Sequence, residues 1–389
     1  MSYISSNSNR FYTALEGSYG EVAAVTAKQR IPALKLAARQ QLEVADRKDK
    51  TGSRTFTGVP AGGRRRTTFD LRSYMTSWAD QTQNPAHGAL FQAGLGAAPM
   101  VFHGAAAGSG SSGHTLVFAA AHGLAPGQAV TFSGEIRFVT AVPDTTRVIL
   151  NAPFSVLPAA GAPIGGTVCY SPATELASLS IFDYWSPSSA LQRILCGAAV
   201  NRFLIQVNGD YHQFEFSGIA QDLIDNSSFS GNAGGLSAFP AEPAVSAFDY
   251  SMVPGNMGQA WLGTGPDRFY TINSASFLVD NALDARAREF GSNLARSISP
   301  GRRSVMLDLE LYEQDDAATM SLYQAARQQS PIEVMFQLGE QSQQLLGVYL
   351  KSVAPEVPEF DDSEHRLRWH FRESRAQGTV DDEIVVAFG

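Results

Sequence analysis

The stretch GRRRTTFDLRSY, residues 63–74, aligns without gaps on the stretch GRRSVMLDLELY, residues 301–312, with six of the twelve positions identical. In the second copy, apolar residues occupy every second position from Val305 to Leu311, which is the period-two pattern of a half-buried β-strand. Thr67, Phe69 and Leu71 alternate in the same way in the first copy. The chain therefore contains an internal duplication built around one strand in each half.

The sequence before each copy is charged, and the charges are unevenly distributed along the chain. Residues 28–72 hold twelve Lys and Arg against four acids, whereas residues 101–265 hold ten acids and four Arg. The stretches 43–58 and 280–296 are too long for a tight hairpin turn, so we expect an extended β-arm before each copy. Only two aromatic residues, Phe56 and Phe69, fall within the basic stretch, which disfavours a nucleic-acid patch. Two interpretations remain, a solvated face and a head-to-tail contact between copies.

The basic side chains of the two arms and of the two Gly-Arg-Arg turns are the candidate contact residues between subunits. They are Arg47, Lys48, Lys50, Arg54, Arg64, Arg65, Arg66, Arg286, Arg288, Arg302 and Arg303. The alternative for the arginine pairs at 64–65 and 302–303 is that they are solvated residues beside a turn.

A short helix is expected after each copy, at residues 85–94 and 315–329. We expect Asp315 to cap the second helix, Met320 and Tyr323 to share one of its faces, and Pro331 to follow its end. Strands are expected to resume after the helices. They cover residues 178–183, 191–207 and 212–217 in the first half, and residues 332–338, 347–353, 365–371 and 383–388 in the second.

The expected fold is mainly β, with two tandem β-sandwich or barrel domains, each flanked by a short α-helix, and a small inserted β-module. The expected limits are an N-terminal arm at 1–30, a first domain at 31–99 and 175–226, a module at 100–174, a linker at 227–268 and a second domain at 269–389. The module has its own predicted strands at 129–132, 136–142 and 147–150. The linker is assigned from its Gly, Ser, Pro and Ala content.

The sequence contains no arrangement typical of an active site. Cys169 and Cys196 are too few for a disulfide framework or a four-cysteine metal site. The GSGSSG run at 108–113 precedes an expected strand, so no helix N-terminus follows to bind a phosphate. The seven His residues are scattered, and the acid pairs at 361–362 and 381–382 are expected in solvated turns. We therefore expect no catalytic, metal or cofactor site and no enzymatic activity.

The first residues lack the basic and apolar regions of a signal peptide, and no apolar run approaches the length of a membrane span. We therefore expect a soluble protein that is made inside the cell and does not contact a membrane.

Several passages resemble the tail tube proteins of long-tailed bacteriophages. They are SFLVDN at 276–281 with the following charged arm, SPGRR at 299–303, LQRILCGAAVN at 191–201, FEFSG at 214–218 and DEIVVA at 382–387. The resemblance covers most of the chain except the insertion. Because this chain contains two such units, it resembles a tail tube protein with a duplicated tube domain.

The resemblance implies a virion protein that polymerises into stacked rings around a channel through which DNA passes without specific binding. The ring would be a trimer with pseudo-sixfold symmetry, or a hexamer. The implied partners are tail terminator, tape-measure and baseplate or tip proteins, with assembly in the bacterial host cytoplasm. A basic bore would hold the phosphates, so we expect an acidic or neutral bore and a basic 28–72 stretch that contacts another subunit.

Other classes remain open. A capsid or head–tail joining protein would share the lack of catalytic residues. A carbohydrate-binding or receptor-binding β-sandwich should have clustered exposed aromatic residues, but the four Trp residues are dispersed through the chain.

Overall fold

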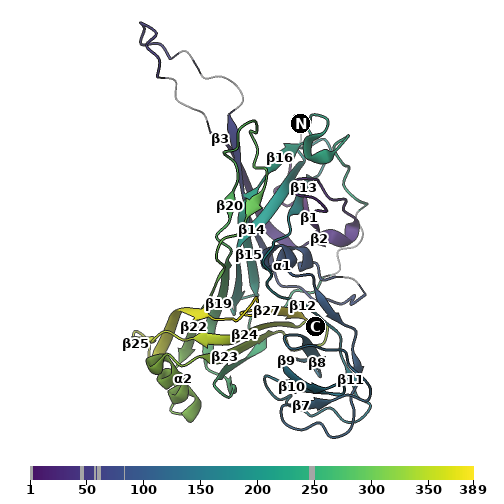
Figure 1. Ribbon diagram of the computed structural model, residues 1–389, viewed down its shortest axis with the longest axis vertical. Coiled ribbons are helices and arrows are strands. Elements are labelled where there is room, and N and C mark those ends of the chain that lie inside the picture. The colour runs from purple at the N-terminus through teal and green to yellow at the C-terminus, as the bar shows by residue number, and fades with distance from the viewer. Residues whose placement is uncertain (1–2, 44–47, 57, 59–62, 83, 245–249) are drawn as a thin grey trace.

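A computed structural model describes residues 3–43, 48–56, 58, 63–82, 84–244 and 250–389. Within these residues the fold is mainly antiparallel β-sheet, with two α-helices, α1 (Gly88–Leu95) and α2 (Ala317–Gln328). Short 3-10 turns occur at Ala27–Gln29 and Ala233–Gly235. The molecule is elongated, and Figure 1 shows the arm after β3 and the inserted module near opposite ends of its long axis.

The strands fall into three groups along the chain. The first half contains β1 (Asn9–Leu15), β2 (Arg30–Ile31), β3 (Ala33–Glu43), β4 (Arg64–Tyr74), β13 (Leu179–Trp185), β14 (Arg193–Val207), β15 (Gln213–Ala220) and β16 (Asp222–Asp225). The insertion contains β5 (Met100–Phe102), β6 (Ala105–Ala106), β7 (Thr115–Val117), β8 (Ala129–Phe132), β9 (Glu135–Asp144), β10 (Arg147–Leu150), β11 (Pro163–Ile164) and β12 (Thr167–Tyr170). The second half contains β17 (Gly258–Gly263), β18 (Asp267–Phe269), β19 (Ile272–Asp280), β20 (Asp284–Ala285), β21 (Ile298–Ser299), β22 (Ser304–Tyr312), β23 (Ile332–Leu338), β24 (Leu346–Ala354), β25 (Glu359–Asp361), β26 (Arg368–Ala376) and β27 (Val385–Phe388).

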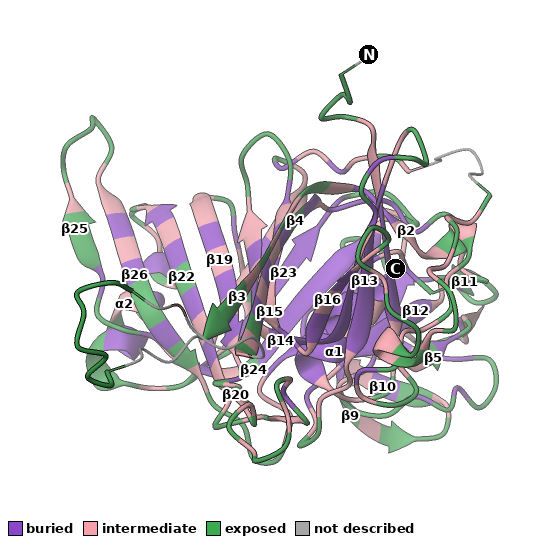
Figure 2. Ribbon diagram, turned by 90° about the horizontal axis from the view of Figure 1, so that it is seen from above, coloured by how far each residue is buried: buried purple, intermediate pink, exposed green. Residues whose placement is uncertain are grey.

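One run of strands crosses both halves of the chain. Its order is β3–β4–β15–β14–β19–β22–β26–β25, and every neighbouring pair in it is antiparallel. The halves join where the second part of β14 pairs with β19. In Figure 2, β25, β26, β22 and β19 follow one another, with buried and less buried residues alternating along each strand.

The register of the strands repeats between the halves. Phe69 of β4 is opposite Ala38 of β3, and the aligned residue Leu307 of β22 is opposite Phe277 of β19. On their other sides, Leu71 is opposite Phe216 and Leu309 is opposite Phe371. The predicted alternation is confirmed, because Thr67, Phe69 and Leu71 are buried in β4 and all four apolar residues predicted in β22 are buried.

The helix α1 contributes the centre of the largest core. Phe91 is fully buried and lies edge-on against Phe203, Phe214, Phe216 and Phe388, with ring centroids 5.3–5.7 Å away. Edge-to-face contacts at this separation are the favoured geometry of aromatic pairs. Because Phe388 belongs to β27 in the second half, the helix of the first half packs against strands of both.

The cap of the second helix lies one residue later than predicted. Asp316 has extended backbone angles, and its carboxylate accepts the N–H of Thr319 at 2.7 Å. Asp315 therefore does not cap the helix. Met320 is 47% exposed, and the buried side of the helix carries Leu322, Ala325 and Ala326.

Three expected domain limits need correction. Residues 1–30 are not a separate arm, because β1 pairs with β13 along its whole length. The stretch 227–268 is not entirely a linker, since β17 pairs with β23 and with β18. The insertion 100–174 includes two strands of the large sheet, because β12 pairs with both β5 and β27. The separate module is therefore confined to residues 105–164.

The inserted module is fixed to the second half of the chain. Phe138 of β9 stacks on Tyr349 of β24 with ring centroids 5.1 Å apart. The Arg137 side chain has no exposed area, donates to Gln337 at 3.2 Å and lies 3.1 Å from Glu135. Burial lowers the pKa of Arg137 to about 10, so it stays charged at neutral pH. A charge buried with its partners in this way restrains the module against β23.

Replacing Phe91 with Ala should lower the free energy of unfolding by about 3–5 kcal/mol, because a buried aromatic ring is lost and a cavity remains. Urea unfolding followed by fluorescence measures this. The matched control is Met320→Ala on the exposed face of α2, which should change stability by less than about 0.5 kcal/mol. Equal effects of the two substitutions would contradict the packing described for α1.

Candidate functional site

The roots of the two arms lie side by side and line a groove of about 660 Å³. The start of β4 forms one wall, and the stretch from β20 to β21 forms the other. The N–H of Arg65 donates to the carbonyl of Asn293 at 2.8 Å, and the Arg64 guanidinium donates to the carbonyl of Arg288 at 3.3 Å. Five predicted contact residues are thereby brought together, namely Arg64, Arg65, Arg66, Arg286 and Arg288.

Three of these five arginines carry the free charge of the groove. Arg64, Arg66 and Arg288 are exposed and form no ion pair within the described part of the chain. Arg286 pairs with Glu289, three residues away. Arg65 points to the opposite face of β4, where its guanidinium lies 3.2 Å from Asp222. The charge of Arg65 is therefore paired within its own chain, although its side chain is 39% exposed.

The remaining predicted residues lie elsewhere. Lys48, Lys50 and Arg54 are exposed on the arm that extends beyond the end of β3 (Figure 1). Arg47 lies outside the described residues. Arg302 is exposed, but it does not line the groove.

Arg303 forms ion pairs within its own chain. Its guanidinium lies 2.5 Å from both Asp381 and Glu383 and donates to the carbonyl of Ala173 at 2.9 Å. The side chain is only 13% exposed. The interpretation of Arg303 as a solvated residue is therefore wrong, and its charge is neutralised within its own chain. The expectation that the acids at 381–382 are solvated is wrong for the same reason, since Asp382 also pairs with Lys351 at 2.9 Å.

The run of strands from β3 to β25 forms the main sheet of the molecule. One face of this main sheet is polar, and we call it the polar face. Residues directly opposite in antiparallel strands project from the same face, so the strand registers define its members. They include Lys35, Arg39, Arg66, Asp70, Arg72, Glu215, Arg202, Asp280, Asp308, Glu310, Arg368 and His370. Arg202 pairs with Asp280 at 2.6 Å across the junction of the halves, and Arg72 pairs with Glu215 at 3.6 Å.

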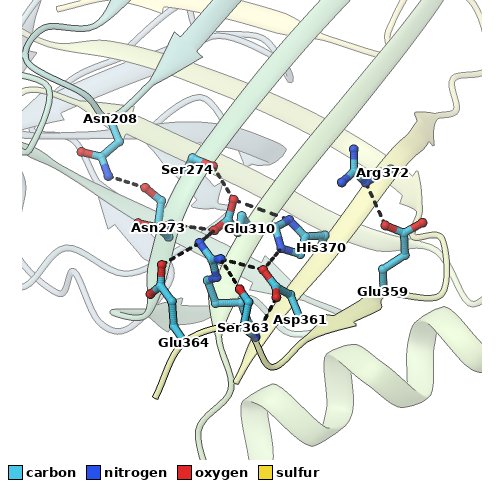
Figure 3. A network of polar contacts seen from close by, with 11 residues as sticks. Asn208, Asn273, Ser274, Glu310, Glu359, Asp361, Ser363, Glu364, His370 and Arg372 are labelled. Carbon is cyan, nitrogen blue, oxygen red and sulfur yellow. Dashed lines mark hydrogen bonds and ion pairs between the residues drawn. The ribbon is translucent and has the colours of Figure 1, made fainter. Parts of the chain in front are cut away.

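A hollow of about 1230 Å³ opens on this polar face in the second half of the chain. Glu310 accepts hydrogen bonds from Asn273 at 2.7 Å and from Arg368 at 3.2 Å, and lies 3.5 Å from His370 (Figure 3). Arg368 also binds Asp361 of β25 at 2.6 Å. Hydrogen bonds from Ser363 and the charge of Arg368 lower the pKa of Asp361, so it is ionised throughout the physiological range.

This network holds strands together but lacks the geometry of serine catalysis. The Ser274 hydroxyl donates to Glu310 at 3.4 Å rather than to the His370 ring. A serine nucleophile needs a base within hydrogen-bonding reach of its hydroxyl. The chemistry that the network supports is the neutralisation of charges across β19, β22, β26 and β25.

The two cysteines are buried packing residues. Burial raises the pKa of Cys169 to about 11 and that of Cys196 to about 12, so both are protonated thiols at neutral pH. Among the described residues, no group of three or more His, Cys, Asp and Glu side chains is arranged to hold a metal ion. No helix in the described part of the chain is long and apolar enough to cross a membrane.

No protein-family model matches this chain, and no curated protein matches it. Its function must therefore be inferred from strand order, register and charge.

Replacing Arg303 with Met should lower the free energy of unfolding by roughly 2–3 kcal/mol, because two partly buried carboxylates lose their cation. The matched control is the neighbouring Arg302→Met, which should change stability by less than about 0.5 kcal/mol because that side chain is exposed. Thermal unfolding of both variants measures the difference. Equal stability of the two variants would contradict the ion pairs described for Arg303.

Proposed function

We propose that this chain is a structural virion protein that polymerises into stacked rings and forms the tail tube of a long-tailed bacteriophage. The tube is the conduit for genome delivery, and the protein assembles in the cytoplasm of the bacterial host. Its other partners are tail terminator, tape-measure and baseplate or tip proteins. The observation that supports this proposal most is the repeated strand register of the two halves within one sheet.

The repeat favours a ring of three chains. Each chain supplies two units, the second beside the first, joined at β14 and β19. If the same side-by-side step is repeated between chains, three chains supply six units of similar shape. A ring of six chains is the competing arrangement. Edge strands of neighbouring chains then pair and protect backbone groups that an isolated sheet edge exposes to water.

The polar face is the proposed wall of the bore. DNA has to slide through the tube, and a wall rich in free basic residues would retain it through phosphate contacts. Arg72, Arg202 and Arg368 of this face are paired with acids. Lys35, Arg39 and Arg66 of the same face form no ion pair among the described residues, so the wall carries both neutralised and free cations. On this proposal the basic stretch 28–72 is divided between two surfaces, because Lys35 and Arg39 share the polar face.

The arms are the proposed contacts along the tube axis. A tube needs a heterologous contact that does not close on itself. The exposed cations Lys48, Lys50 and Arg54 lie on the first arm, and Arg64 and Arg66 lie at its root beside the second arm. Acidic surfaces of the next ring complement such charges without a large apolar patch on the free subunit.

Two of the four tryptophans give the rival carbohydrate-binding function no support. Trp78 and Trp369 are only 7% and 3% exposed, so they are unsuited to stacking on a sugar ring at the surface.

Electron microscopy of the purified, concentrated protein should show long hollow tubes of uniform diameter, because the proposal gives the chain both ring and stacking contacts. Analytical ultracentrifugation across a concentration series is the second measurement. A protein that stays monomeric at all concentrations would contradict the tube.

Reversing the charge of two groove residues, Arg64→Glu with Arg66→Glu, should lower the yield of tubes roughly tenfold, because repulsion recurs in every subunit of a ring. The matched control is Arg147→Glu, at a 61% exposed arginine on the inserted module. It should leave tube yield unchanged. Circular dichroism checks that both variants are folded. Normal tubes from the double variant would contradict a role for the groove in ring stacking.

A further inference from the structure

Two strands at opposite ends of the main sheet have a free edge. Within the described residues, β3 pairs only with β4, and β25 pairs only with β26. β3 is eleven residues long and carries exposed Leu34 and Leu42. A long edge strand with exposed apolar residues is a template for pairing with another chain. Both edges are therefore candidate docking surfaces.

The internal junction between β14 and β19 provides a template for joining these edges. Leu204, Ile205 and Gln206 of β14 are opposite Glu215, Phe214 and Gln213 of β15. In the second half, Glu359, Phe360 and Asp361 of β25 are opposite His370, Trp369 and Arg368 of β26. These two sets are equivalent, because β4 and β22 fix β15 and β26 in the same register. β25 is thus the counterpart of the part of β14 that pairs with β19.

The other side of the template is equally defined. β3 corresponds to β19, since Ala38 is opposite Phe69 and Phe277 is opposite the aligned residue Leu307. In the internal junction, Ile205 is opposite Phe277 and Leu204 is opposite Leu278. The equivalent pairs between two copies are Phe360 with Ala38 and Glu359 with Arg39.

We propose that β3 of one copy pairs with β25 of a second copy in the register that β19 adopts on β14. The inference rests on the proposed function and specifies its lateral contact. The partner is a second copy of this chain, and the backbone of β3 continues the sheet of its neighbour. Arg39 then lies directly opposite Glu359 on the polar face, and Ala37 lies opposite Asp361.

Charge and size both fit this register. Arg39 and Glu359 are exposed in the single chain and carry opposite charges, and Glu359 also forms an exposed pair with Arg372 at 3.1 Å. Directly opposed unlike charges stabilise an antiparallel pair. Phe360 is 57% exposed, whereas its counterpart Ile205 is fully buried and lies opposite Phe277. In the internal junction the medium-sized Ile205 faces the large Phe277. Between copies, the large Phe360 faces the small Ala38.

Site-directed cross-linking tests the register. Arg39→Cys and Glu359→Cys are made in separate full-length proteins, which are mixed, assembled and oxidised. Directly opposed residues have Cβ atoms about 4.5–5.5 Å apart, near the range that a disulfide closes. Because Cys169 and Cys196 are buried, they should not compete. A covalent dimer is expected on a non-reducing gel.

The matched control is a mixture of Ala38→Cys protein with Glu359→Cys protein. Ala38 projects from the opposite face of β3, so it should yield roughly tenfold less dimer with Glu359→Cys. Equal yields from both mixtures would overturn the register. A charge exchange is the second measurement. Arg39→Glu and Glu359→Arg should each reduce assembly several-fold, and the double variant should restore it.

The outcomes separate this inference from the proposed function. Tubes without the expected dimer would overturn the register but would not contradict the proposed tail tube. The expected covalent dimer in rings that never stack supports the register and contradicts the tube. A charge-exchanged double variant that assembles no better than either single variant overturns the Arg39–Glu359 contact.

Discussion

The second part of β14 is hydrogen-bonded to β15 on one side and to β19 on the other, and the two halves of the chain become one sheet there. Phe203 and Ile205 of this strand are buried beneath the sheet, while Arg202 pairs with Asp280 across the junction on the polar face. Without this shared strand, each half would expose an edge that needs another partner. The continuous run of strands from β3 to β25 depends on this one pairing.

The sequence was most informative where the relevant interactions are local. Alternation in β4 and β22 predicts their buried residues correctly, because one face of each strand is covered and the other is open. β23 has the limits expected from its apolar run. β1 was missed because Phe11, Tyr12, Thr13 and Ala14 are all buried, so a strand covered on both sides lacks the alternating pattern.

The charged contacts were harder to predict because their partners are distant in sequence. Arg303 and its partners Asp381 and Glu383 are about eighty residues apart, and only the folded sheet brings them together. The same holds for Arg65 and Asp222. Two adjacent arginines that look alike in the sequence thus differ, since Arg303 is bound internally and Arg302 is exposed. Five of the arginines predicted from the sequence line the groove between the arms. The shape of the groove depends on the pairing of Arg65 with Asn293, which the sequence does not indicate.

The central claim is that the halves are equivalent wall segments of one hollow polymer. Cryo-electron microscopy of the assembled protein tests it most directly, through the radial position of each half in the ring. The account predicts that the strands β4–β15–β14 and β22–β26–β25 alternate around the bore at the same radius. A ring with one half lining the bore and the other half outside it would contradict the account.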